Sequence, residues 1–294
     1  MSTLDDFASR IGTIEELPGP FGPALRERVR PQEAVQLLIY SPPFVTPGGT
    51  IPATVLAVVE RRWLMASEGE AGRVTVTESG FDDTLLLELT SVLLHGQLKI
   101  DFVDGGAARS AAVEFNTVMM KDYRAAVGLM LGGMEGRPIT TEADADASAL
   151  FAQPLFAQWP YKFRNLSPEY LPQGRRARAA VYWPTVYGGF NREIAPAAAL
   201  LLSESEVVLF SEEKAPWWYR TRQELKLGDI VTYFPLHRLA RFHLSQNDRF
   251  GVLSLEVHAY HGGEKLEVLF ALEQAEAVSR LMEQAMEQAT TPAA

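Results

Sequence analysis

Pro31-Gln32, followed by a strand-like run that ends Ile39-Tyr40-Ser41-Pro42, has a counterpart in Pro172-Gln173 and a run that ends Val181-Tyr182-Trp183-Pro184. In each case a turn-rich loop and then a second apolar run come next. Because the same order recurs more than a hundred residues later, we predict that the chain contains two copies of one structural unit.

The later part of each unit predicts an antiparallel hairpin and a closing helix. Residues 97–102 alternate apolar and polar side chains, which is the period of a half-buried strand. Gly-Gly pairs at 105–106 and 262–263 are expected to form the hairpin turns. Apolar residues three or four apart predict one helix that ends near Leu131 and another over about 272–289.

The composition bounds the function. The chain has 294 residues, a formal net charge of -10 and no cysteine. The acidic balance disfavours nucleic acid and anionic membrane surfaces, and the lack of thiols excludes disulfides and thiolate metal sites. Residues 1–10 do not resemble a signal peptide, and no apolar run approaches the ~20 residues of a membrane span. We expect a soluble, cytoplasmic protein.

The run Leu56-Ala57-Val58-Val59-Glu60-Arg61-Arg62-Trp63-Leu64-Met65 resembles the strand–turn–strand signature of bacterial pleckstrin-homology-like (PH-like) domains. Residues 200–209 are similar to it in the second half. The resemblance implies an α+β, mainly β fold: two tandem PH-like domains, each a bent antiparallel sheet or partly open barrel capped by a C-terminal helix. The domains would span 30–135 and 171–290.

Two segments fall outside the predicted domains. Residues 1–29 look like an N-terminal arm, and residues 136–170 look like a linker that is first acidic and then aromatic and basic. The acidic, alanine-rich part, 141–148, is predicted to be mobile. Residues 151–170 are rich in aromatic side chains and proline, so we expect them to pack against a domain.

Phosphoinositide binding, the best-known property of PH domains, is disfavoured by the residues themselves. It needs several cations around the loop between the first two strands. That loop has no basic residue over 41–52, and over 184–196 it has only Arg192, which Glu193 offsets.

One basic cluster with interleaved aromatic residues lies at the end of the linker. Such a cluster can bind nucleic acid or a phosphorylated partner. Alternatively, the aromatic residues pack the linker onto a domain while the cations balance acidic stretches, and we favour this second interpretation. The cations are Lys162, Arg164, Arg175, Arg176 and Arg178.

A second candidate is the run Trp217, Trp218, Tyr219 and Arg220, with Arg222 close behind it. Neighbouring side chains on a strand point to opposite faces, so three consecutive aromatic residues cannot all be buried in one core. At least one of them is expected to contact a protein partner or the other domain.

Enzymatic and metal-binding signatures are missing. There is no nucleophile elbow, no phosphate-binding glycine loop, no His-Glu-x-x-His and no dinucleotide fingerprint. His258 and His261 lie near a predicted turn, where their spacing does not aim both rings at one metal ion. We expect no catalytic residue, no cofactor and no metal.

The predicted role is a protein-interaction or scaffolding module with a protein partner. A peptide would add to a strand edge beside the closing helix. In the first unit the groove would involve residues 89–94 and the helix near Tyr123 and Arg124. In the second it would involve residues 234–244 and the helix near 274–281. One alternative is a peripheral membrane module that uses Trp217, Trp218 and the basic cluster. A second is an unrecognised small-molecule-binding protein or hydrolase. The partner, the domain orientation and the oligomeric state stay open.

Overall fold

The computed structural model describes residues 9–46, 49–69, 72–136, 154–172, 174–189, 192–213 and 228–290. As predicted, the fold is mainly β, with several antiparallel sheets, none of which is closed. Within these residues, no helix combines the length and apolar character that a bilayer crossing requires.

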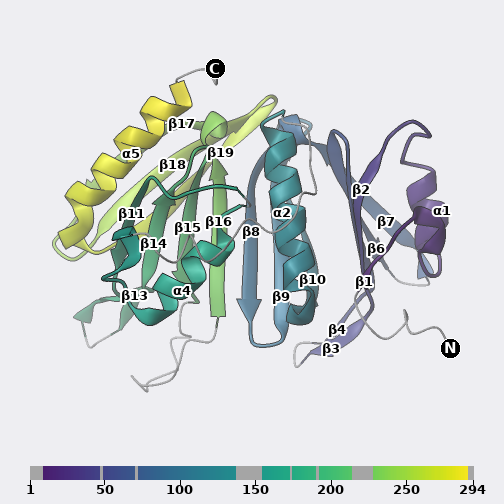
Figure 1. The fold of residues 1–294 in the computed structure, drawn as a ribbon, viewed down its shortest axis with the longest axis horizontal. Helices are drawn as coiled ribbons and strands as arrows, with labels where there is room; N and C mark the ends of the chain where they lie inside the picture. The colour runs from purple at the N-terminus through teal and green to yellow at the C-terminus, as the bar shows by residue number, and fades with distance from the viewer. Residues whose placement is uncertain are drawn as a thin grey trace.

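The first half consists of a sheet of order β1-β2-β5-β6-β7, then three strands β8–β10, then helix α2 (Figure 1). A small hairpin, β3–β4, projects between β2 and β5. The bounds are β1 (Ser9–Arg10), α1 (Phe21–Arg26), β2 (Val35–Ser41), β3 (Phe44–Thr46), β4 (Gly49–Ile51), β5 (Thr54–Val59), β6 (Arg62–Glu68), β7 (Val74–Gly80), the 3-10 helix η4 (Phe81–Asp83), β8 (Thr84–Val92), β9 (His95–Asp104), β10 (Ala107–Asn116) and α2 (Met120–Met134).

The second half repeats this order, as the sequence layout predicts. Strands β11, β14, β15 and β16 correspond to β2, β5, β6 and β7, strands β17–β19 correspond to β8–β10, and α5 corresponds to α2. The bounds are α4 (Tyr161–Tyr170), β11 (Ala179–Trp183), β12 (Val186–Tyr187), β13 (Glu193–Ala195), β14 (Ala198–Leu202), β15 (Glu206–Glu212), β16 (Gly228–Pro235), the 3-10 helix η8 (Leu236–Arg238), β17 (Leu239–Gln246), β18 (Gly251–Ala259), β19 (Gly262–Phe270) and α5 (Ala275–Thr290).

One continuous sheet joins the two halves. Its order is β10-β9-β8-β16-β15-β14-β11, and the joint is the antiparallel pair β8–β16 at the centre of the molecule (Figure 1). Leu87 lies opposite Tyr233, and Val92 lies opposite Gly228. The peptide groove predicted at residues 89–94 is therefore wrong, because β16 already occupies that edge over Leu89–Val92.

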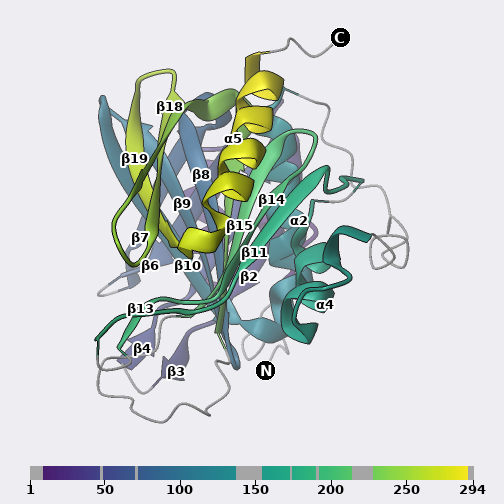
Figure 2. The same ribbon diagram turned by 90° about the vertical axis from the view of Figure 1, so that its left-hand side faces the viewer.

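Both halves contribute to one core on a single face of this sheet. Helix α2 lies over β8–β10, and α4 lies over the strands of the second half (Figure 1). The core combines Tyr123 of α2 with Phe163 of α4 and with Val231 and Tyr233 of β16, all almost fully buried. A second core lies between the other face, β17–β19 and α5, which crosses the open side of the second half (Figure 2).

The segments before each half cover its outer sheet face. In the first half, Phe21 and Leu25 of α1 pack on Tyr40 and Leu64. In the second half, Phe163 of α4 makes an edge contact with the ring of Phe210, with centroids 5.2 Å apart. Residues 154–170 thus pack against the second half, as the aromatic composition predicts for this part of the linker.

The predicted turns are confirmed in the first half and need correction in the second. Gly105 and Gly106 form the β9–β10 turn, with φ of 59° and 82°. In the second hairpin Ala259 pairs with Gly262, so the turn residues are Tyr260 and His261. Gly263 has a different role: a Cβ there would lie 2.4 Å from Cδ2 of His258, so only glycine fits.

A glycine–phenylalanine pair recurs at one position of both halves. Gly96 lies opposite Phe115 across β9 and β10, and Gly251 lies opposite Phe270 across β18 and β19. Each ring covers its glycine so closely that a Cβ would lie 2.4 Å or 2.2 Å from the nearest ring carbon. The pair fixes the register of the second and third strands in both halves.

Candidate binding surfaces

The aromatic candidates Trp217, Trp218 and Tyr219, with Arg220 and Arg222, lie outside the described residues. The basic cluster of the linker is described, and four of its five cations contact charged or aromatic side chains of the same chain. Lys162 Nζ lies 2.7 Å from Asp229 Oδ1, and the Arg164 guanidinium lies over the Tyr161 ring at 5.7 Å from its centroid.

Arg175 and Arg178 meet acidic groups through their side chains, and Arg176 does so through its backbone. Arg175 binds Glu135 through Nη2, Arg178 Nε lies 3.7 Å from Glu204 Oε1, and the backbone N–H of Arg176 donates to Glu204 at 3.0 Å. With Phe163 and Tyr170 buried, these contacts favour the interpretation that the cluster is structural.

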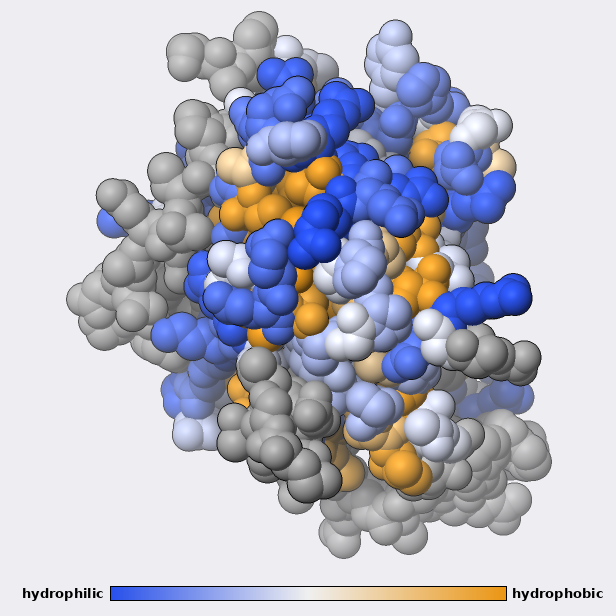
Figure 3. Space-filling model, turned by 90° about the vertical axis from the view of Figure 1, so that its right-hand side faces the viewer, coloured by the Kyte–Doolittle hydropathy of each residue, from blue (hydrophilic) through white to orange (hydrophobic). Residues whose placement is uncertain are grey.

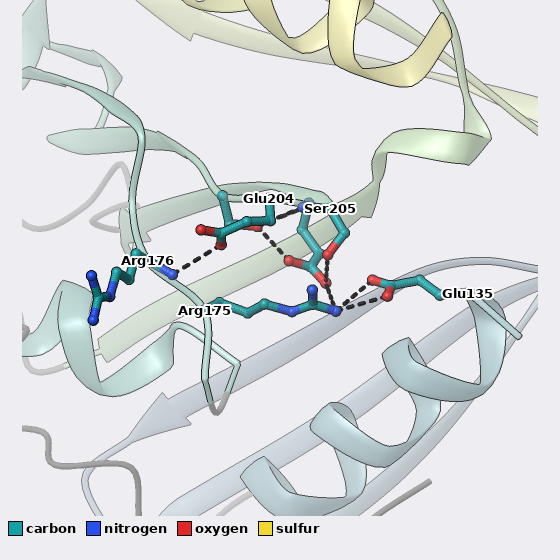
Figure 4. A network of polar contacts seen from close by, with 7 residues as sticks. Glu135, Arg175, Arg176, Glu204 and Ser205 are labelled. Carbon is teal, nitrogen blue, oxygen red and sulfur yellow. Dashed lines mark hydrogen bonds and ion pairs between the residues drawn. The ribbon is translucent and has the colours of Figure 1, made fainter. Parts of the chain in front are cut away.

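Figure 4 shows the contact that Arg175 makes between the halves. Its Nη2 donates to both oxygens of Glu135, at the end of α2, at 2.8 and 2.7 Å. The same nitrogen lies 3.6 Å from Glu206 Oε1, at the start of β15. Glu206 also accepts hydrogen bonds from the hydroxyls of Ser203 and Ser205. The network connects the last turn of the first half to a strand of the second.

The two carboxyl groups of this network titrate differently. Glu206 has no exposed surface, and burial raises its pKa to about 7 in spite of Arg175 and Ser203. For Glu135 burial acts in the same direction, but hydrogen bonds from Ser205 and Arg175 outweigh it and lower the pKa. Glu206 is therefore the group that takes up the proton near neutral pH, and one negative charge then balances Arg175.

Among the described residues, the strands that end the three larger sheets pair on one side only: β1, β7, β10, β11, β17 and β19. β7 pairs only with β6, and β17 pairs only with β18. The edge of β17 lies in the second half beside α5, which packs against that strand. The second groove predicted from the sequence comprises residues 234–244, of which 239–244 lie in β17, and the helix near 274–281; β17 and α5 are in contact.

The side chains of β17 alternate along this edge. Phe242 and Leu244 are half-buried and pack against the second core, whereas Arg241, His243 and Ser245 are exposed. On the exposed face, Arg241 Nε lies 2.6 Å from Glu256 Oε2 of β18, beside an open hollow of about 320 Å³. The strand thus combines apolar anchoring positions with an unpaired backbone.

The turn between β8 and β9 consists of Leu93 and Leu94, which are 65% and 70% exposed. Leu93 has a φ of 54°, in the left-handed region that leucine avoids. Val118 is 81% exposed beside Thr117, whose hydroxyl donates to the Leu93 carbonyl. The end of the molecule that carries this turn therefore presents apolar side chains on a strained backbone.

The other candidate sites do not assemble. His261 Nδ1 lies 2.7 Å from Asp83 Oδ1 and connects the second hairpin to the first half. The described part of the chain contains no group of three or more histidine or acidic side chains placed to hold a metal ion. An open hollow of about 360 Å³ is lined by Lys162, Phe163, Tyr182 and Glu212, where Lys162 and Glu212 pair at 3.6 Å.

Comparison of the chain with protein-family models, with curated proteins and with solved structures finds no match.

Proposed function

We propose that the protein is a non-enzymatic scaffold of two tandem PH-like units that binds an extended segment of a protein along the free edge of β17. The observation that carries this proposal is the β8–β16 joint. β8 and β17 occupy the same position in the two halves, and the edge of β8 accepts a strand from within the chain. The edge of β17 has the same backbone and no partner strand among the residues that the structure describes.

The two strands correspond in detail. Each follows a three-residue 3-10 helix, and each carries a register shift near its start, between Thr84 and Leu86 in β8 and between Leu239 and Arg241 in β17. Strand addition supplies backbone hydrogen bonds for affinity, and the alternate side chains supply specificity. Phe242 and Leu244 are the positions that a bound segment would cover.

A pair of proline variants tests this edge. Successive backbone N–H groups of a strand point to opposite sides, so of Leu244 and Ser245 one donates toward β18 and the other toward the free edge. We therefore compare Leu244→Pro and Ser245→Pro. The variant whose N–H faces the free edge is expected to keep its melting temperature, whereas the other loses a ladder hydrogen bond and melts earlier.

The readout is the set of proteins that each variant retains from a native lysate, identified by mass spectrometry. The variant with unchanged melting temperature is expected to lose a partner that the wild type retains. The proposal is contradicted if this variant retains every protein that the wild type retains, or if the wild type retains none.

The Leu93–Leu94 turn favours a second candidate function, insertion of this apolar turn into a membrane surface. Because Lys162, Arg175 and Arg178 of the linker form ion pairs within the chain, binding would depend on the leucines and only weakly on salt. Flotation with phosphatidylserine-containing vesicles tests this. The double change Leu93→Ser and Leu94→Ser should abolish flotation, and Tyr260→Ser, at another exposed turn, should not. Equal flotation of both variants, or none by the wild type, would exclude this function.

A further inference from the structure

The free edges of β7 and β17 belong to opposite halves of the molecule (Figure 1). We infer that they bind each other between copies: the edge of β17 of one copy pairs, antiparallel, with the edge of β7 of the next copy. This inference rests on the proposed function and names the extended segment that β17 binds. The chain already contains one such joint, between β8 and β16.

The strands of the proposed contact correspond to the strands of the internal joint. β7 relates to β6 as β16 relates to β15, since Arg62 lies opposite Gly80 and Glu206 lies opposite Pro235. Both β7 and β16 then run directly into a three-residue 3-10 helix. β17 corresponds to β8 through the matched register shifts. A β17–β7 pair would therefore repeat, between copies, the joint that connects the two halves.

The internal joint also predicts the register. Val231 lies opposite Leu89. Val231 in β16 and Val76 in β7 lie the same number of residues before the end of their strands. Leu89 in β8 and Leu244 in β17 lie the same number of residues after the start of theirs. Val76 of one copy would thus lie opposite Leu244 of the next. By the same count, Thr75 would lie opposite Ser245, and Thr77 opposite His243.

The side chains at these positions fit the pairing. Val76 and Leu244 are both half-buried apolar residues at unpaired edges, and none of the three predicted pairs places like charges opposite each other. Figure 3 looks at the end of the molecule that carries α1 and the sheet of β7, and it shows hydrophobic surface between hydrophilic residues. Pairing would cover part of the apolar surface of Val76 and Leu244.

The geometry makes the contact head-to-tail. A patch on one half binds a different patch on the other half of the next copy, so the contact is heterologous and builds open chains or closed rings. The net charge of -10 opposes the approach of a second copy, and salt screens that repulsion. Assembly is therefore expected to rise with protein concentration and with ionic strength.

The cysteine-free sequence allows a direct test of the register by disulfide trapping. Residues directly opposite in antiparallel strands have Cα atoms about 4.5–5.5 Å apart, within the span of a disulfide. We mix the full-length variants Val76→Cys and Leu244→Cys under oxidising conditions at moderate salt. A cross-linked dimer is expected from the mixture, at a yield well above that of either variant alone. A chain with both changes should give a ladder of higher species.

Matched variants control for chance collision and for geometry. Val74→Cys mixed with Leu244→Cys is two residues out of register and should cross-link much less. Within one chain, Leu89→Cys with Val231→Cys is the corresponding pair of the internal joint and should form an intramolecular disulfide. Light scattering after gel filtration gives a second readout, in which the mass of the wild type rises with concentration. The proline variant with a blocked free edge should stay monomeric.

The outcomes separate this inference from the proposed function. Absence of the Val76–Leu244 cross-link, or equal yield from the out-of-register mixture, would overturn the inference while the Leu89–Val231 control cross-links. If the edge-blocking proline still removes a different protein partner, the proposed function stands and the occupant is that partner. If the β17 amides that face the free edge stay unprotected from hydrogen exchange at all concentrations and with lysate proteins, both proposals fail.

Discussion

Leu89 of β8 and Val231 of β16 lie directly opposite each other in the shared sheet, one from each half of the chain, with 1% and 0% of their surface exposed. Their contact lies within a core to which α2 and α4 both contribute. Neither half could leave the other without exposing this apolar surface to water, so the two copies of the unit form one packing unit.

This relationship predicts cooperative unfolding. Val231→Ala removes buried methyl groups at the joint and should lower the free energy of unfolding by about 2 kcal/mol. Hydrogen exchange in increasing urea, followed by mass spectrometry, should give one midpoint for peptides of β9 and β18, shifted together in the variant. Val45→Ala, at a side chain that is 81% exposed, is the control and should change little. Separate midpoints for the two halves would contradict the prediction.

The glycine–phenylalanine pairs predict a matched effect in both halves. Gly96→Ala and Gly251→Ala each place a methyl group inside the van der Waals radius of a buried ring, which should cost about 1–3 kcal/mol. Gly128→Ala is the control: it lies within α2 with no heavy atom within 4 Å of the new Cβ, and it should stabilise by about 0.5–1 kcal/mol. Thermal denaturation measures all three. Stability losses in only one half would argue against an equivalent role of the pairs.

Glu206 predicts a pH dependence of stability. Burial raises the pKa of its folded-state carboxyl from the ordinary value of 4.5 to about 7. Its contribution to stability is therefore fully present below pH 4.5 and is lost as the pH rises through about 7. Glu206→Gln keeps the shape of the protonated group and cannot ionise. The stability of the variant relative to the wild type should therefore increase as the pH rises from 6 to 8. Urea midpoints of both proteins across this range measure the gain, and a constant difference would refute it.

Because leucine is unfavourable at the left-handed φ of Leu93, we expect that this residue serves the function of the protein and not its stability. Leucine at φ 54° is strained, and asparagine tolerates that conformation better, so Leu93→Asn should stabilise the fold by about 0.5–1 kcal/mol. Leu94→Asn is the control, because Leu94 has no positive φ and should show no gain. Thermal denaturation compares the two. A destabilised Leu93→Asn would indicate that the leucine side chain stabilises the turn.

Local patterns account for what could be predicted about the strands and helices. The alternation over 97–102 lies in β9, the glycines at 105–106 form a turn, and the closing helices are α2 and α5, each after a short 3-10 turn. The prediction of the second turn is wrong because Gly262-Gly263 has the same residues as the Gly105-Gly106 turn. Gly263 is needed there for close contact with His258, which depends on the facing strand.

The candidate surfaces were less predictable, because their roles depend on distant partners. The basic cluster appears in the sequence as adjacent cations, yet Arg175 binds Glu135 from the first half and Lys162 binds Asp229 of β16. The residues next to Glu206 in the sequence do not predict that its carboxyl group is buried, because its burial comes from the packing of the two halves. The glycine–phenylalanine pairs did leave a signal in the sequence, because Gly96 and Phe115 are the same number of residues apart as Gly251 and Phe270.

The sequence by itself determined the repeated order of strands, turns and helices, because side-chain periodicity and turn residues act within a few positions of each other. The tertiary structure alone decided which strand edges meet. Every residue other than proline offers the same backbone N–H and C=O at a strand edge. The sequence of β8 therefore does not predict that β16 pairs with it. That choice, made by the packing of two cores against each other, closes the edge of β8 and leaves β7 and β17 without partners in the described chain.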